Sequence, residues 1–213
     1  MERAALWRAG GWTAIVAGAL LIVDTAVRAL APADTVVWGR LGGLPPEVWQ
    51  LPGMAGTVLA LLGVIAIYAC QADRAGRLGL AGFVLVVVGL AVGAVYSTVF
   101  NGLYVPWLAQ HIPGDIETVV TAPPTAGMIV RGILVQAVGL GLGAILLGVA
   151  TIRAGVLSAA GGWLLIAGAV LAAVSELTLV LRGLSVVGFA VAFIVLGVAV
   201  RHSPDIPVPA GAD

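Results

Sequence analysis

The sequence predicts an all-α, polytopic membrane protein, and three observations support this fold class. The 213-residue chain is 61% hydrophobic, more than a soluble domain of this size needs. The apolar residues form long blocks separated by short polar stretches, and a block of about 20 apolar residues spans a bilayer as a helix. The sequence lacks the short segments of alternating polarity that are typical of a transmembrane barrel.

We expect six transmembrane helices arranged as three helical hairpins. The apolar blocks place these helices near residues 10–30, 53–70, 78–100, 125–151, 156–176 and 179–200. Residues 1–202 would then form a single six-helix transmembrane domain. The tail "SPDIPVPAGAD", residues 203–213, is predicted to be a disordered cytoplasmic segment.

A cleaved signal peptide is an alternative interpretation of the N-terminus. "MERAALWR", the apolar stretch after it and "ALAPAD" resemble such a peptide with a small-residue cleavage site. Asp24 and Arg28 interrupt the apolar region ahead of that site, however. We therefore expect the first helix to be retained.

The arginines predict the orientation of the helices, since the chain has no lysine. Six arginines precede the first helix, lie in the short turns after the second and fourth helices, or follow the sixth: Arg3, Arg8, Arg74, Arg77, Arg153 and Arg201. With six spans these positions share one side of the membrane, which the positive-inside bias assigns to the cytoplasm. Both termini are therefore expected inside (N-in/C-in), and the longer loops at 31–52 and 101–127 outside.

The three outward-running helices share a sequence pattern. "RAGGWTAIVAGALLIVD", "RAGRLGLAGFVLVVVGLAVGAVY" and "RAGVLSAAGGWLLIAGAVLAAVSE" each hold Arg-Ala-Gly, then Gly plus an aromatic, then an apolar stretch. Each stretch ends in a polar group (Asp24, Tyr96 or Glu176), 12 or 13 residues after the aromatic. That spacing is a rise of about 18–20 Å, which places all three groups past the membrane midplane, toward the outside. The pattern predicts three hairpins of one parentage.

Charged residues inside the apolar blocks predict a polar pocket that opens to the outside. Arg28 lies one helical turn beyond Asp24 on the same face. Ion pairing or snorkelling to the head groups is a sufficient explanation for an arginine near a helix end, but the short side chain of Asp24 cannot reach that far. The candidate ligand-binding residues are Asp24, Arg28, Tyr96, Asn101, Tyr104, Arg131, Gln136, Glu176 and Arg182. Three guanidinium groups against two carboxylates suit an anionic or strongly hydrogen-bonding head group.

The predicted outer loops are rich in Trp, Pro and Gly. Trp38, Trp49, Tyr104 and Trp107 suit the membrane interface, where amphipathic aromatic rings gather. The loops are also longer than a minimal helix connection requires, so they can equally form a lid over the pocket. Both interpretations stay open.

The remaining motifs do not predict a second site. His111, Asp115 and Glu117 could be proposed as metal ligands, but one His without a nearby Cys predicts no metal site. "GLGLGAILLG" (139–148) superficially resembles a dinucleotide-binding loop, yet it lies mid-helix, where small residues let helices pack closely; "GLAVG" (89–93) is interpreted in the same way. No cofactor is expected. The zero net charge gives no basic field for a nucleic acid.

The segment "ATIRAGVLSAAGGWLLIAGAVLAAVSE" resembles the DUF4386-like group of small six-helix bacterial membrane proteins of unknown function. In that group a short basic-Gly-x-Leu turn introduces the penultimate helix, and the match is best over residues 125–176. Leu157, Ser158 and Ala159 stand where the group usually has Leu-Pro-Arg. The resemblance implies a multi-pass protein of the bacterial cytoplasmic (inner) membrane, and it implies no activity.

Three hypotheses for the function remain open. The first is a protein that binds or moves an amphiphilic small molecule or lipid with a polar or anionic head; three hairpins of one orientation lack the inverted repeat of many transporters, which favours binding. The second is an intramembrane enzyme on a lipid or isoprenoid substrate, such as a cyclase, with Asp24 and Glu176 as acid and base. The third is a structural subunit of a larger membrane complex or homo-oligomer, packed through its small-residue helix faces.

Overall fold

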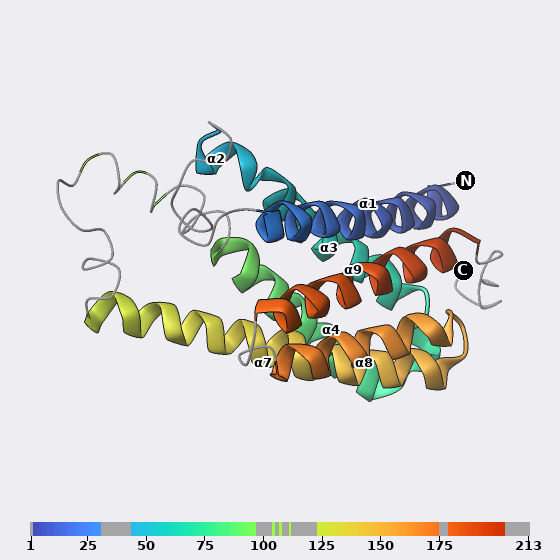
Figure 1. The fold of residues 1–213 in the computed structure, drawn as a ribbon. Helices are drawn as coiled ribbons and strands as arrows, with labels where there is room; N and C mark the ends of the chain where they lie inside the picture. Colours follow the sequence, from blue (N-terminus) through green and yellow to red (C-terminus); the bar gives the residue numbers. More distant parts are fainter. Residues whose placement is uncertain are drawn as a thin grey trace.

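The chain folds into long helices that lie side by side along one direction (Figure 1). The computed structural model describes residues 2–30, 44–96, 104, 107, 111, 123–174 and 179–202, with the side chains of 2–6, 46–47, 123–126, 128–129 and 179–182 excepted. Its helices are α1 (Glu2–Leu30), α2 (Pro46–Trp49), α3 (Leu51–Ala69), α4 (Ala72–Val95), α7 (Pro123–Ala154), α8 (Ala159–Val174) and α9 (Leu179–His202). The predicted all-α class is confirmed for these residues.

Helix length and hydropathy identify the chain as a polytopic membrane protein. Five helices hold stretches long and apolar enough to cross a bilayer: Trp7–Leu30, Leu51–Ala69, Ala72–Val95, Val130–Ala154 and Gly183–His202. The sixth long helix, α8, is apolar but has only 16 residues. Large apolar side chains are exposed on these helices, such as Leu134 at 61% and Trp163 at 62%. Such a surface is stable against lipid and would be costly in water.

The observed helix bounds differ from the predicted ones in several places, and α4 begins at Ala72 and not near residue 78. α1 begins at Glu2 and not near residue 10, because the strong helix formers of "ERAALWRA" continue the helix beyond the apolar block. The loop predicted at 31–52 contains the one-turn helix α2, which starts at Pro46, a residue suited to a first helical position. The predicted helix ends at 97–100 and 175–176, and the predicted disordered tail at 203–213, lie outside the described residues.

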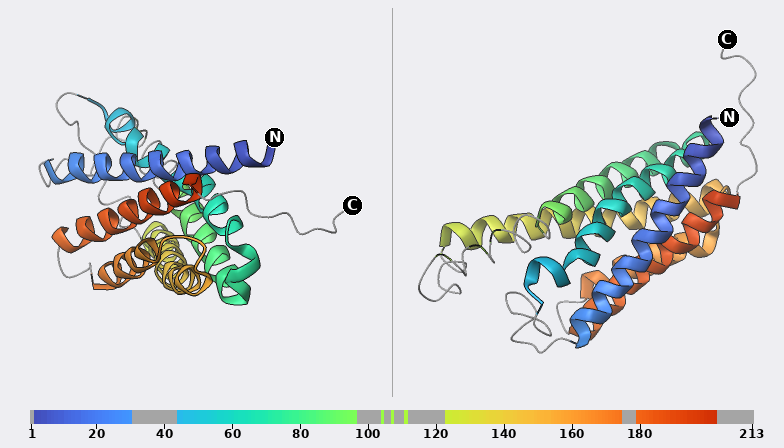
Figure 2. Two further views of the ribbon diagram at one scale, coloured as in Figure 1. Left: turned by 90° about the vertical axis from the view of Figure 1, so that its right-hand side faces the viewer. Right: turned by 90° about the horizontal axis from the view of Figure 1, so that it is seen from above.

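The helices form a closed ring in chain order (Figure 2). α1 packs against α3, α3 against α4, α4 against α7, α7 against α8, α8 against α9, and α9 returns to α1. Helices paired in the predicted hairpins are thus in contact, although neighbouring hairpins are in contact as well. The two described chain ends and the α3–α4 and α7–α8 turns lie at one end, here called the turn end, and the opposite end is called the loop end (Figure 1).

Glycines bring α4 and α7 into close backbone contact. A Cβ atom built on Gly139 would lie 2.9 Å from the Cα atom of Gly89, and one built on Gly143 would lie 2.7 Å from the backbone nitrogen of Val86. No larger residue fits at either position unless the helices separate. The interpretation of both glycine-rich stretches as close-packing surfaces is confirmed.

Two copies of the repeated Arg-Ala-Gly motif form turns at the turn end. Gly76 and Gly155 have φ angles of 58° and 63°, the left-handed region that a residue with a Cβ rarely adopts. Gly155 ends α7 ahead of the turn into α8, and Gly76 bends the chain within the first turns of α4. In the first copy, Gly10 is helical, because α1 runs straight through it. The motif is therefore a turn signal in two of its three occurrences.

Candidate functional site

Asp24 and Arg28 form an ion pair near the loop end of α1. The Nε group of Arg28 donates a hydrogen bond of 2.8 Å to Oδ2 of Asp24, across one helical turn. Asp24 lies six residues before the last residue of the helix, a rise of roughly 9 Å. The two side chains differ in exposure, 12% for Asp24 and 33% for Arg28. The carboxylate is therefore largely buried, while the guanidinium reaches the surface.

The first turn of α3 covers the carboxylate of Asp24. A Cβ atom built on Gly53 would lie 2.6 Å from Oδ1, 2.7 Å from Cγ and 2.9 Å from Oδ2 of Asp24. Only a glycine lets the backbone of α3 come this close. The amino-terminal end of a helix carries a partial positive charge, so it is a favourable neighbour for a carboxylate.

Two further side chains complete the site at the start of α3. Trp49 is 4% exposed, and its ring lies under the guanidinium of Arg28, 5.4 Å from Cζ to the ring centroid. Gln50, the residue ahead of α3, is 1% exposed. Gln50 and Gly53 are three residues apart, which places them on the same side of the first helical turn. We call Asp24, Arg28, Trp49, Gln50 and Gly53 the loop-end cluster.

Several polar atoms of Asp24, Arg28 and Gln50 have no hydrogen-bond partner among the described residues. Oδ1 of Asp24 and both amide atoms of Gln50, Oε1 and Nε2, are buried without a partner in the described part of the chain. The two Nη groups of Arg28 likewise make no hydrogen bond to another described residue. An unsatisfied buried polar group costs roughly 1–3 kcal/mol, so a cluster of several needs a functional or solvent explanation.

Two other predicted site residues lie together on α4 and α7. The amide of Gln136 packs on Gly93, where a built Cβ would lie 2.7 Å from Nε2. Tyr96, at the carboxyl end of α4, is three residues beyond Gly93 and is half-buried. Arg131 is exposed on α7 and makes no ion pair within the described residues. Tyr104 is 44% exposed. No ion pair or hydrogen bond joins Gln136 or Arg131 to the loop-end cluster within the described residues.

The rest of the prediction falls outside the described residues. Asn101 and Glu176 belong to undescribed stretches, and Arg182 lies in α9 with an undescribed side chain. Its neighbour Gly183 approaches Thr25 of α1, since a Cβ built there would lie 3.6 Å from Cγ2 of Thr25. The backbone of α9 therefore begins beside the α1 turn that carries Asp24.

Sequence reasoning missed Gln50 and Gly53 as members of the site. Gln50 carried a usable signal, because it is an uncharged polar residue directly ahead of an apolar span. Gly53 carried none, because glycines are frequent in this chain and only the packing of α3 on α1 distinguishes this one.

A buried polar contact at the turn end was also missed. Nε2 of Gln71 donates a 2.9 Å hydrogen bond to Oγ1 of Thr151, whose hydroxyl donates to the carbonyl of Leu147. Gln71 and Thr151 are 1% and 0% exposed. This contact ties the α3–α4 turn to α7 and is accounted for by packing, apart from one unpaired oxygen of Gln71.

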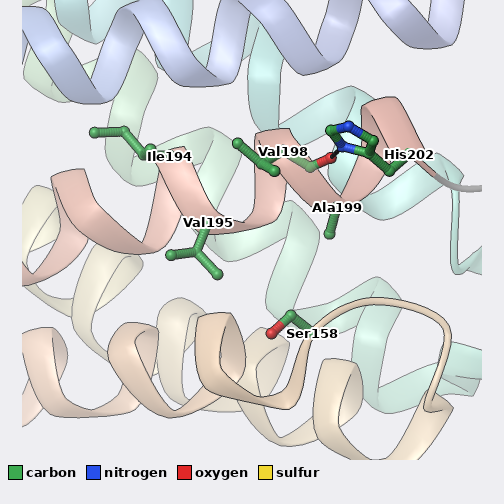
Figure 3. Close-up of a pocket in the computed structure, with 6 residues that line it drawn as sticks. All are labelled: Ser158, Ile194, Val195, Val198, Ala199 and His202. Atoms are coloured by element: carbon green, nitrogen blue, oxygen red, sulfur yellow. Dashed lines mark hydrogen bonds between the residues drawn. The ribbon is translucent and has the colours of Figure 1, made fainter.

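A groove of about 440 Å³ opens at the turn end between α9 and the start of α8 (Figure 3). It is lined by Ser158, Ile194, Val195, Val198, Ala199 and His202. Its wall is apolar, and Nδ1 of His202 lies 2.8 Å from the carbonyl oxygen of Val198. None of the predicted site residues lines this groove.

Of the three residues considered as metal ligands, the structure describes only His111. His111 stacks on Trp107, with 4.7 Å between ring centroids, and its Nδ1 lies 2.9 Å from the Trp107 carbonyl oxygen. Asp115 and Glu117 lie outside the described residues. Over the described part of the chain, no group of three or more His, Cys, Asp or Glu residues is arranged to hold a metal ion.

Comparison of the chain with protein-family models, curated proteins and solved structures found no match.

Proposed function

We propose that this membrane protein binds or moves an amphiphilic small molecule or lipid with a polar or anionic head, and that the head binds at the loop-end cluster. One observation carries the proposal. Arg28 is held in place by Asp24 and by the ring of Trp49, while its two Nη groups have no described hydrogen-bond partner. A guanidinium fixed in this way presents two parallel donors, the geometry that suits phosphate and carboxylate oxygens.

The orientation that we propose places this site toward the outside. Arg8, Arg74, Arg77 and Arg153 are exposed at the turn end, and Arg201 is half-buried there with its guanidinium 3.9 Å from the centroid of the Trp12 ring. A basic end that also holds both described chain ends supports an N-in/C-in topology by the positive-inside bias. The loop-end cluster would then lie near the outer surface of the membrane. From the resemblance to the DUF4386-like group, we propose that this membrane is the bacterial inner membrane.

The repeat offers further support for three hairpins of one parentage. The glycine before the aromatic in each copy, Gly11, Gly82 and Gly162, is buried. A Cβ built on each of them would collide with a neighbouring helix. The helix contacted differs, however: Gly82 faces α7, its partner in the predicted hairpin, whereas Gly11 faces α9 and Gly162 faces α7, which belong to neighbouring predicted hairpins. Whether the three hairpins superpose stays a prediction.

The enzyme alternative rests on a narrower observation. Oδ1 of Asp24 is buried without a hydrogen-bond partner in the described part of the chain, which leaves one carboxyl oxygen for a substrate group. The proposed second carboxyl, Glu176, lies outside the described residues.

The test is lipid binding by the full chain in detergent, followed by native mass spectrometry. Arg28→Gln should reduce the binding of phospholipids, because it removes the charged donors of the cluster. Arg153→Gln is the matched control, since it removes one exposed arginine at the turn end, and it should bind as the wild type does. Equal binding by both variants would remove the loop-end cluster from the proposal.

A further inference from the structure

The unpaired atoms of the loop-end cluster include both hydrogen-bond donors and acceptors. The donors are the Nη groups of Arg28 and Nε2 of Gln50, and the acceptors are Oδ1 of Asp24 and Oε1 of Gln50. A hydrogen bond to a carboxylate oxygen is stronger than one to a neutral oxygen, so leaving Oδ1 of Asp24 without a donor is especially unfavourable. A ligand that satisfies the cluster must therefore donate as well as accept.

The charges of Asp24 and Arg28 further limit which head groups the cluster can bind. Asp24 and Arg28 neutralise each other, with one contact of 2.8 Å between them. A purely anionic head would pair with Arg28 and leave Oδ1 of Asp24 without a donor. A purely cationic head would pair with Asp24 and draw it away from Arg28. A head with one charge of each sign compensates both residues and keeps the total at zero, which is the favourable arrangement in a poorly solvated place.

We infer that the loop-end cluster recognises a zwitterionic head group that joins a primary ammonium to a phosphate or carboxylate through a few bonds. The ammonium donates to Oδ1 of Asp24 and Oε1 of Gln50, and the anion accepts from Arg28 and Nε2 of Gln50. This inference rests on the proposed function and assigns its ligand class. Phosphatidylethanolamine is a lipid with this chemistry, and glycerophosphoethanolamine is the same head without a tail.

The last residue of α2 lies against the cluster. The unpaired atoms of Asp24 and Gln50 have almost no accessible surface, and Trp49, the last residue of α2, is 4% exposed beside them.

The experiment compares three phospholipids with identical tails on the full chain in detergent, measured by native mass spectrometry. Phosphatidylethanolamine has an N–H-bearing ammonium and a phosphate. Phosphatidylcholine has a cation without N–H groups, and phosphatidylmethanol has the phosphate alone. Losing one charged hydrogen bond costs about a factor of ten in affinity, so phosphatidylethanolamine should bind roughly tenfold more tightly than either of the other two.

Two substitutions test the assignment of atoms. Asp24→Asn should bring the affinities for phosphatidylethanolamine and phosphatidylcholine close to each other, while phosphatidylmethanol still binds through Arg28. Because Asp24→Asn could impair folding, Gln50→Leu provides an independent readout and should weaken the same preference several-fold. Gln71→Leu is its matched control, because Gln71 is an equally buried glutamine in the turn between α3 and α4, and this variant should leave the preference unchanged.

The possible outcomes separate this inference from the proposed function. If binding depends on Arg28 but is tightest for phosphatidylmethanol, or is equal for all three lipids, the inferred zwitterionic ligand is wrong and the proposed function stands. Binding of all three lipids that does not depend on Arg28 overturns both. Competition by glycerophosphoethanolamine supports the inference with the head alone as ligand. A preference for phosphatidylethanolamine that this soluble head does not compete away supports the inference with a lipid as ligand.

Discussion

Replacing Gly53 by alanine tests the packing of α3 on Asp24 with a single methyl group. The added Cβ would lie 2.6 Å from Oδ1 of Asp24, which is about 0.8 Å short of an ordinary contact at 3.4 Å. The carboxyl must move away, and its 2.8 Å hydrogen bond with Arg28 is strained or lost. Overpacking of this kind costs about 1–3 kcal/mol, and the helix propensity gained from alanine offsets less than 1 kcal/mol of it.

We expect Gly53→Ala to lower the free energy of unfolding by about 1–2 kcal/mol, or the Tm by roughly 2–8 °C, in thermal unfolding of the detergent-solubilised protein. Gly141→Ala is the control, because a Cβ built on Gly141 meets nothing within 4 Å. Asp24→Ala removes the colliding carboxyl, so the Gly53→Ala and Asp24→Ala double variant should lose about 1 kcal/mol less than the sum of the single losses. An unchanged Tm for Gly53→Ala, or additive losses, would refute this packing.

Three further predictions concern the bundle. Gly139→Ala should cost about 1–3 kcal/mol in thermal unfolding, because its Cβ meets the backbone of α4 and no side chain can yield. Thr151→Val should cost about 1–3 kcal/mol by leaving Nε2 of Gln71 unpaired, and adding Gln71→Leu should restore most of it. A cysteine at Asp73, exposed in the first turn of α4, should react with an impermeant maleimide only after permeabilisation, whereas one at Leu44 should react in intact cells.

Each of these three has a result that would contradict it. A wild-type Tm for Gly139→Ala would mean that α4 and α7 are not in backbone contact. A double variant as unstable as Thr151→Val alone would mean that the glutamine amide is not the source of the loss. Labelling of the Asp73→Cys variant in intact cells would contradict the N-in/C-in topology. The native Cys70 is buried, so the background of this assay is low.

The fold class could be predicted because a transmembrane helix can be recognised from its own sequence. Twenty apolar residues in a row are recognised without knowing any neighbour, and all six predicted helices have counterparts in the structure. The Asp24–Arg28 pair was equally accessible, because a spacing of four residues fixes neighbours on one helix. Both inferences use only the geometry of a single helix.

The partners of this pair could not be predicted, because they depend on which helices pack together. Hydropathy is similar on every face of these helices, so the sequence does not indicate that the first turn of α3 covers Asp24. The same limit applies to Arg131, which sits on a helix whose neighbours are α4 and α8. The Arg-Ala-Gly motif was predicted as a repeat marker, and its physical cause, a left-handed glycine at Gly76 and Gly155, became visible only from backbone angles.

The most direct test of the account is to find where a head group contacts the chain. The probe is a phosphatidylethanolamine with a photoactivatable diazirine in its tail, close to the glycerol, incorporated with the wild-type protein in nanodiscs. We expect saturable cross-links on the peptide that contains Trp49, Gln50 and Gly53, lost in Arg28→Gln and kept in Arg153→Gln. Cross-links confined to the α8–α9 groove around Ser158 and His202, or indifferent to Arg28→Gln, would contradict a binding site at the loop-end cluster.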